Sequence, residues 1–343
     1  MKIALDATYS LGPNLSGVGV YSREVLYGLA RAHPEAGYLF CYRPQRYFRS
    51  FSYRLPGGCH RRFLGKGWPA SADLFHGLNQ RIHFGLDGSP RNRRTVSTFH
   101  DLFVMTGDYS SPEFRARFTA QARDAAARSD LIIAVSSFTA SQVEYLLAVE
   151  PARIRVVHHG VRLALATAKK ENLVLSVGAI QRRKNIARLV KAFESLPDSW
   201  RLSLAGAPDG FGAVEELRAI EQSPARARID VLGYVSAEEL DSLYCRAAIF
   251  AFPTLDEGFG MPILEAIAHG VPVLTSNCSA MPEVAGDAAM LVDPMDIGDA
   301  LLRLAADPSL RDDLARRGLD RIKQFSWESA IEKTWAAAPP EGG

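Results

Sequence analysis

The sequence predicts an α/β protein with two doubly wound domains, each a parallel sheet with helices on both faces. Short apolar runs alternate with stretches of helical periodicity along the chain. The alternation starts twice, once at the N-terminus and again at residues 171–180, after a stretch without strong periodicity at 162–172. The length of 343 residues also suits two domains of about 150 to 200 residues each.

The individual elements follow from local patterns of apolar and β-branched residues. In the first half, strands are predicted at 2–7, 38–43, 73–79, 94–102, 130–137 and 153–161, with helices over 19–34 and 112–129. In the second half, strands are predicted at 171–180, 200–208, 228–235, 247–254 and 270–277, with a helix over 184–197. We therefore expect an N-terminal domain at 1–165, a C-terminal domain at 166–324, and a terminal segment at 325–343.

That terminal segment contains a helical stripe of three large apolar residues, Trp327, Ile331 and Trp335. A final helix that caps the second domain is the simple interpretation of this stripe.

Composition excludes several classes of protein. The chain is 47% hydrophobic and 23% charged, as soluble globular proteins are. It has no run of about 18 apolar residues, and no secretory leader is expected from "MKIALDATYS". The four cysteines show neither C-x-x-C nor zinc spacing, so we expect reduced thiols and a cytoplasmic location. Residues 1–165 carry 21 Lys and Arg against 12 Asp and Glu, a charge of +9, whereas the remainder carries 19 against 26, a charge of −7.

Ligands of doubly wound sheets bind at the carboxyl ends of the strands. One stretch in that position reads "DEGFGMPILEAIAHGVPVL" at 256–274. Its glycines lead into a helix with Pro262 near the start, so the N–H groups of Gly258 to Met261 are expected to favour phosphate. Glu257 and Glu265, the latter expected in the first helical turn, would accept hydrogen bonds from hydroxyls. Taken alone, an ordinary strand-to-helix turn explains the stretch equally well.

Three other loops occupy equivalent positions after strands. "GAIQRRKN" places Arg183 and Lys184 where two cations could neutralise a diphosphate, although a solvated basic turn is the simpler interpretation. "SGVGVYS" places Gly17 before a helix, which is also typical of a tight turn. "TFHDL" places His100 and Asp101 at the end of a strand, where a histidine is more often structural than catalytic.

Together these residues resemble the retaining family 4 glycosyltransferases, including the mannosyltransferase-like bacterial members. The stretch at 256–274 is similar to the E-x7-E signature of that family, and "VGAIQRRKN", "GYVSAEEL", "FSWESAIEKTW", "SGVGVYS" and "FHDL" match in type and order. The resemblance covers nearly the whole chain. It implies the GT-B architecture, two Rossmann-like domains facing a central cleft, with the donor bound mainly by the C-terminal domain and the last helix crossing back to the first.

The resemblance also implies roles for individual residues. Glu257 would bind the donor sugar's hydroxyls and Glu265 the ribose, while Lys184 would hold the diphosphate. The rest of the donor site would be formed by Gly17, Arg183, Gly258, Phe259, Gly260, Met261 and Leu264. His100, followed by Asp101, resembles the residue that contacts the donor sugar and orients the reacting pair. Many members have an arginine where this chain has Ala179, and Arg183 would substitute for it.

The activity implied is metal-independent transfer of a hexose from a nucleotide sugar, first of all mannose from GDP-mannose, with retention of anomeric configuration by front-face attack. No cofactor is expected, and no Asp-x-Asp metal motif is present. The acceptor would be a saccharide or a polyprenyl-linked saccharide, as in polysaccharide biosynthesis. A nucleotide-sugar-binding protein without transfer activity and a sugar-nucleotide 2-epimerase stay open as alternatives. A phosphorylase is disfavoured by the short chain.

One segment bears on where the protein acts. Residues 43–68 interleave arginine and lysine with tyrosine, phenylalanine and tryptophan. An anionic membrane surface would bind such a segment, and the protein would then be peripheral on the inner face of the membrane. A solvated loop is the alternative. Single-stranded nucleic acid also suits basic and aromatic residues, but no other feature supports it, and no nucleic-acid partner is expected.

Overall fold

A computed structural model describes residues 1–65, 69, 72–82, 93–163 and 168–337. The chain divides into two compact units. The first unit comprises residues 1–106, 111–160 and 327–343, and the second comprises 107–110 and 161–326. The boundary after residue 160 lies five residues before the expected one, and a short excursion at 107–110 joins the second unit.

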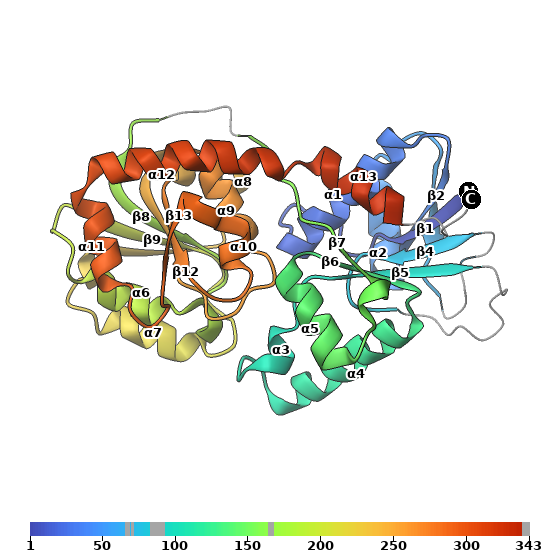
Figure 1. The fold of residues 1–343 in the computed structure, drawn as a ribbon, viewed down its shortest axis with the longest axis horizontal. Helices are drawn as coiled ribbons and strands as arrows, with labels where there is room; N and C mark the ends of the chain where they lie inside the picture. Colours follow the sequence, from blue (N-terminus) through green and yellow to red (C-terminus); the bar gives the residue numbers. More distant parts are fainter. Residues whose placement is uncertain (66–68, 70–71, 83–92, 164–167, 338–343) are drawn as a thin grey trace. The chain divides into compact units, whose positions relative to one another are not determined.

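The first unit is built on a seven-stranded parallel sheet (Figure 1). Its spatial order is β3-β2-β1-β4-β5-β6-β7, so the order reverses between β1 and β4. In that order the strands are β3 (Cys59–Phe63), β2 (Gly37–Tyr42), β1 (Lys2–Asp6), β4 (Leu74–Gly77), β5 (Arg94–Phe99), β6 (Leu131–Ala134) and β7 (Ile154–Val156). The helices are α1 (Gly17–Ala32), α2 (Pro44–Tyr47), α3 (Phe103–Thr106), α4 (Pro112–Arg128), α5 (Ser137–Leu147) and α13 (Trp327–Ala337), with 3-10 turns η1 (Phe48–Ser52) and η2 (Pro151–Arg153).

The second unit repeats this plan with a six-stranded parallel sheet of order β10-β9-β8-β11-β12-β13. The strands are β10 (Ile229–Gly233), β9 (Arg201–Ala205), β8 (Glu171–Val177), β11 (Ala247–Phe252), β12 (Val273–Ser276) and β13 (Ala289–Val292). The helices are α6 (Ile186–Phe193), α7 (Ala213–Glu221), α8 (Ala237–Arg246), α9 (Met261–Ala268), α10 (Met281–Ala285), α11 (Gly298–Ala306) and α12 (Pro308–Arg321). The 3-10 turns are η3 (Arg182–Lys184), η4 (Arg226–Arg228), η5 (Gly286–Ala288) and η6 (Ile322–Gln324).

Helices cover both faces of each sheet, as the alternating pattern predicted (Figure 1). In the second unit, α6 packs with α7 and α11 on one face, and α9 packs with α10 and α12 on the other. The central strand β11 is buried along its whole length, which a parallel sheet covered on both faces requires. The fold class inferred from the sequence is therefore confirmed.

Two strands escaped the sequence analysis. The edge strand β3 reads "CHRRF" and exposes most of its side chains, so it lacks the apolar run that marks a buried strand. The strand β13, at one edge of the second sheet, has four residues of which only Ala289 is fully buried. Conversely, the strand expected at 153–161 is reduced to the three residues of β7.

The helix expected at 184–197 starts later, at Ile186. Asn185 has a left-handed φ of 60°, so the 3-10 turn at Lys184 and the α-helix are separate elements. Because of this break, Arg183 and Lys184 lie in the 3-10 turn and not in the α-helix that follows. Both side chains belong to the candidate site described below.

The terminal helix α13 packs within the first unit against α1. Trp327 and Ile331 are buried there, and the ring of Trp335 stacks on His33 with centroids 3.9 Å apart. A Cβ on Gly28 of α1 would lie 2.1 Å from Cδ1 of Ile331, so only glycine permits this approach. The apolar stripe recognised in the sequence thus serves the core of the first unit.

Candidate functional site

The candidate site of the second unit lies where its strand order reverses, at the carboxyl ends of β8 and β11. Such a reversal leaves a crevice between two loops that run in opposite directions, and ligands of doubly wound folds bind there. The loop after β8 carries η3, and the loop after β11 carries the "TLDEGFG" stretch. The backbone joins them, because the Leu255 N–H donates to the Arg183 carbonyl at 2.8 Å.

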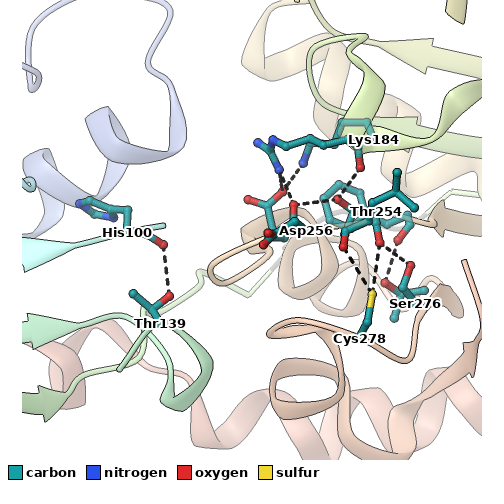
Figure 2. Close-up of polar contacts among 12 residues, drawn as sticks. His100, Thr139, Lys184, Thr254, Asp256, Ser276 and Cys278 are labelled. Atoms are coloured by element: carbon teal, nitrogen blue, oxygen red, sulfur yellow. Dashed lines mark hydrogen bonds and ion pairs between the residues drawn. The ribbon is translucent and has the colours of Figure 1, made fainter. Parts of the chain in front are cut away.

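Side chains reinforce this junction (Figure 2). The Thr254 hydroxyl lies 3.1 Å from the Arg183 carbonyl, and the Ser276 hydroxyl donates to the Thr254 carbonyl at 2.6 Å. The Asn185 amide donates to the carbonyls of Pro253 and Pro294 at 3.1 and 2.6 Å. The loop that carries the two cations is therefore fixed to the end of β11.

The carboxylate of Glu257 contacts both Arg183 and Lys184. Its Oε2 accepts a hydrogen bond from Nη1 of Arg183 at 2.6 Å and another from Nζ of Lys184. Nη1 of Arg183 also donates to the Asp256 carbonyl at 2.9 Å, and Nζ of Lys184 lies 4.1 Å from the centre of the Phe252 ring. The side chain of Glu257 is 15% exposed and those of both cations 10%, so water screens these charges weakly.

Electrostatics keep Glu257 ionised. Burial raises the pKa of this carboxyl, but the charges of Arg183 and Lys184, with their hydrogen bonds, outweigh burial and lower the pKa to about 2. A carboxyl with so low a pKa cannot act as a general acid or base near neutral pH. It can accept hydrogen bonds and hold cations, which agrees with a binding role.

The glycines between the two glutamates set the start of α9. Gly260 has a φ of +91°, and a Cβ there would lie 2.8 Å from Cε of Met281, so the position requires glycine. The helix begins at Met261, and Glu265 is its fifth residue. The expectation that Glu265 occupies the first turn is therefore wrong. The side chain of Leu264 is buried in the core, which leaves only its backbone for a ligand.

Glu265 is held from the neighbouring helix α8. The hydroxyl of Tyr244 donates to its Oε2 at 2.9 Å, and burial raises the pKa of the Glu265 carboxyl. The ring of Tyr244 stacks on His269 with centroids 5.0 Å apart. His269 lies 2.8 Å from the Glu265 carbonyl through Nδ1 and 3.3 Å from Asp241 through Nε2.

The candidate residues of the first unit follow β5 or begin α1. His100 is 6% exposed, and its Nε2 lies 3.0 Å from the carbonyl oxygen of Leu78. That oxygen can only accept, so Nε2 carries the proton and Nδ1 is the acceptor nitrogen of the neutral ring. Burial lowers the pKa of His100 to about 4, and its ring packs against Tyr21 and His159 at 4.8 and 5.5 Å.

The structure thus groups the predicted residues by unit. Arg183, Lys184 and Glu257 form one hydrogen-bonded cluster, and Glu265 lies on the helix that follows it. The predicted donor-site residues Gly258, Phe259 and Gly260 are buried in the same loop. In the first unit, Asp101 is half-buried after His100, and Gly17 is an exposed residue at the start of α1, which Ser16 caps.

Comparisons with known proteins place the chain in a family. A family model described as Glycosyltransferase Family 4 matches residues 16–165, and one described as Glycosyl transferases group 1 matches residues 162–321. The O-antigen chain mannosyltransferase B of Escherichia coli is 32% identical over 283 residues, which cover 76% of this chain and 72% of that protein. The chain belongs to glycosyltransferase family 4.

One further relative and one solved structure are also similar to the chain, and the structure bears on the fold alone. The D-inositol 3-phosphate glycosyltransferase of a Nocardioides species is 27% identical over 300 residues, covering 74% of this chain and 65% of that protein. The sucrose-phosphate synthase of Thermosynechococcus elongatus matches the structure with a TM-score of 0.80 and 21% identity, over 98% of both chains. The resemblance of the sequence to family 4 and the GT-B fold class are therefore both confirmed.

Two residues of this family 4 site were missed by the sequence analysis. Asn185 adopts the left-handed conformation that joins η3 to α6, and a signal was present, because asparagine tolerates that conformation and follows two cations. Tyr244 lies 21 positions before its partner Glu265, on another helix. The helical pattern around Tyr244 does not predict which residue of another helix its hydroxyl contacts.

Within the described residues of this glycosyltransferase, no group of three or more His, Cys, Asp or Glu side chains is arranged to hold a metal ion. In the same residues, no helix combines the length and apolar character needed to cross a membrane.

Proposed function

We propose that this family 4 glycosyltransferase moves a hexose, first of all mannose, from a nucleoside diphosphate sugar to a saccharide or lipid-linked saccharide acceptor. The cluster of Arg183, Lys184 and Glu257 carries the proposal. It puts two nearly buried cations at the switch point of the second sheet, where a diphosphate would bind. The name of the 32% identical mannosyltransferase supports mannose, and GDP-mannose is the first donor to test.

The role of each group follows from its charge and position. A departing nucleoside diphosphate gains negative charge, and preorganised cations in a poorly hydrated site stabilise that charge. Lys184 and Arg183 supply these cations. Glu257 stays ionised and accepts hydrogen bonds from the sugar's hydroxyls, in part replacing those it now accepts from the two cations. Glu265 accepts from the ribose hydroxyls, with Tyr244 holding its carboxylate in place.

We further propose retention of anomeric configuration by front-face attack. The acceptor oxygen bonds to the anomeric carbon on the side from which the diphosphate leaves, and the acceptor's proton passes to a phosphate oxygen. The low pKa of Glu257 supports this scheme, because an ionised carboxylate bound to two cations is a poor nucleophile and a poor base. No metal ion is required, since the cations of the protein balance the leaving group.

A donor panel tests the proposal. The full chain is incubated with GDP-mannose, UDP-glucose, UDP-galactose and ADP-glucose, with and without saccharide acceptors and with EDTA. We expect nucleoside diphosphate release that depends on donor and acceptor, persists in EDTA, and yields a product whose anomeric proton shows retention by NMR. Binding without turnover would indicate a nucleotide-sugar-binding protein instead. An acceptor-independent epimerised sugar would indicate a 2-epimerase, and loss of activity in EDTA that Mg²⁺ restores would refute metal independence.

A further inference from the structure

Between β2 and the edge strand β3 the chain forms two short turns, α2 and η1, which expose aromatic side chains. Phe48, Phe51 and Phe63 are 76%, 60% and 47% exposed. Their rings surround Tyr47 at centroid distances of 5.7, 5.5 and 4.8 Å, respectively. Exposed apolar groups gathered in one place mark an interaction surface more often than single exposed residues do.

The charge around these rings has one sign. Residues 43–65 contain six arginines and neither aspartate nor glutamate. Arg49 is exposed beside the rings in sequence, and Arg46 is half-buried. Arg62 alternates with Phe63 along β3 and therefore points to the other face of the sheet. We call Tyr47, Phe48, Phe51 and Phe63, together with Arg46 and Arg49, the aromatic–arginine surface. Lys66 and Trp68, which belong to the same basic segment of the sequence, lie outside the described residues.

Arg61 has a different role from its neighbours. Its guanidinium donates to the Ser50 carbonyl at 3.2 Å and to the Tyr53 carbonyl, and lies 4.9 Å from the centre of the Phe51 ring. It therefore links η1 to β3 and keeps the aromatic rings exposed together. Because Arg61 holds the loop, its substitution would change the shape of the surface as well as its charge.

We propose that the aromatic–arginine surface binds the headgroup region of an anionic lipid bilayer. Aromatic side chains partition into the boundary between headgroups and acyl chains, and arginines around them attract anionic lipid phosphates. Both components are present on the adjacent turns α2 and η1, and β3 adds Phe63. This binding is independent of the proposed reaction, because it requires neither donor nor acceptor. A bilayer is a partner that the proposed function does not include, and binding to it would bring this unit to lipid-linked acceptors.

The arrangement of the rings favours a bilayer over the other candidate partners. Single-stranded nucleic acid needs separate ring faces on which bases stack. Here the rings pack against Tyr47, and Arg61 covers Phe51. A second copy of the chain would bring two surfaces of the same charge together, which costs free energy. Anionic lipid complements both the charge and the apolar rings.

Co-sedimentation with vesicles tests the proposal on the full chain. We expect binding to phosphatidylcholine vesicles containing phosphatidylglycerol at about one third, and much weaker binding to phosphatidylcholine alone. Arg46→Gln and Arg49→Gln should each lower the partition coefficient for anionic vesicles about fivefold. The double variant Phe48→Ser/Phe51→Ser should lower binding to a residual level set by charge alone. All these positions are exposed or on short turns, so the fold should persist, which circular dichroism checks.

Matched controls separate this surface from general charge and hydrophobicity. Tyr145→Ser removes an 86% exposed aromatic residue on α5, and Arg218→Gln removes an exposed arginine on α7; neither should alter vesicle binding. Equal binding to neutral and anionic vesicles, or variants that bind as the parent does, would overturn the proposal. So would tight binding of a poly-dT oligonucleotide, lost in the same variants, or concentration-dependent dimers abolished by Phe48→Ser/Phe51→Ser.

Discussion

Glu257 resolves a difficulty posed by the sequence, in which a carboxylate precedes a glycine-rich turn suited to an anion. The structure pairs Glu257 with Arg183 and Lys184, so its charge offsets theirs until a ligand arrives. Removing one member of such a buried ionic cluster leaves the others uncompensated, which typically costs about 3 to 5 kcal/mol. The carboxylate is thus needed to hold the cations in place.

The pH dependence of stability follows from the same cluster of three charges. The pKa of Glu257 is about 2 in the folded chain and about 4.3 when unfolded, so the unfolded chain binds the proton first as the pH falls. The stabilisation is fully present above about pH 5 and is lost between about pH 4 and pH 2. We therefore expect Glu257→Gln to flatten the decline of stability in that window.

Hydrogen exchange of the β8 and β11 amides between about pH 5 and pH 2, with urea added, measures this slope within the second unit. The control is Glu238→Gln, at an exposed glutamate of the same unit. If the stability of Glu257→Gln falls with pH as steeply as that of the parent chain, the carboxylate is not paired in solution.

Tyr244 supports a second residue-scale prediction. Its hydroxyl donates to Glu265, and a typical hydrogen bond contributes about 0.5 to 1.5 kcal/mol. Tyr244→Phe should therefore weaken binding of the donor's nucleoside diphosphate roughly two- to tenfold. The effect should vanish for the 2′,3′-dideoxy nucleotide if Glu265 serves the ribose.

Calorimetric titration with both nucleotides provides the measurement, and Tyr145→Phe on the exposed face of α5 is the control. An identical loss for both nucleotides would assign Tyr244 a purely structural role.

At the scale of single elements, the contact of α1 with α13 depends on the absence of a side chain at Gly28. A Cβ at that position would meet Cδ1 of Ile331 at 2.1 Å but its Cβ only at 3.8 Å. Gly28→Ala should therefore destabilise the first unit by about 1 to 3 kcal/mol, the usual cost of overpacking.

The double variant Gly28→Ala/Ile331→Ala tests the contact, because the clash disappears with the longer side chain. We expect it to be less destabilised than the sum of the two single variants, as a double-mutant cycle of urea unfolding would reveal. Gly298→Ala is the control, since no atom lies within 4 Å of a Cβ there. Additive effects of the two substitutions would mean that α13 does not pack on α1 as described.

Elements also show what the sequence could and could not predict. Buried parallel strands such as β11 were found because both faces demand apolar residues. The exposed edge strand β3 carries no such demand and was missed. The cations and Glu257 were correctly assigned to strand ends, and the strand order brings them together. The contact of Tyr244 with Glu265 was not predictable, because it depends on how two helices pack and not on periodicity.

At the scale of the whole molecule, the chain passes between its two units more than once, and the last passage delivers α13 to the first unit. The stripe of Trp327 and Ile331 is buried there, together with Ala330 and Thr334. The sequence predicted the stripe, and the resemblance to family 4 implied that the last helix crosses back to the first domain. The contacts of α13 with α1 and β6 make it part of the first unit's own core.

Deleting residues 327–343 should consequently destabilise the first unit and spare the second. Burying side chains as large as Trp327 and Ile331 contributes about 1.5 to 3 kcal/mol each, so the loss is on the order of 5 kcal/mol, comparable to the total stability of a small domain. Hydrogen exchange should show faster exchange in α1 and β6 but unchanged protection in β8 and β11. Nucleoside diphosphate binding should persist if the donor site lies in the second unit alone.

Lys333→Glu, on the exposed face of α13, is the control for a change in the helix without loss of its stripe. Loss of protection in β8 and β11 after the deletion would show that α13 is required by both units, because neither strand belongs to the unit in which the stripe is buried.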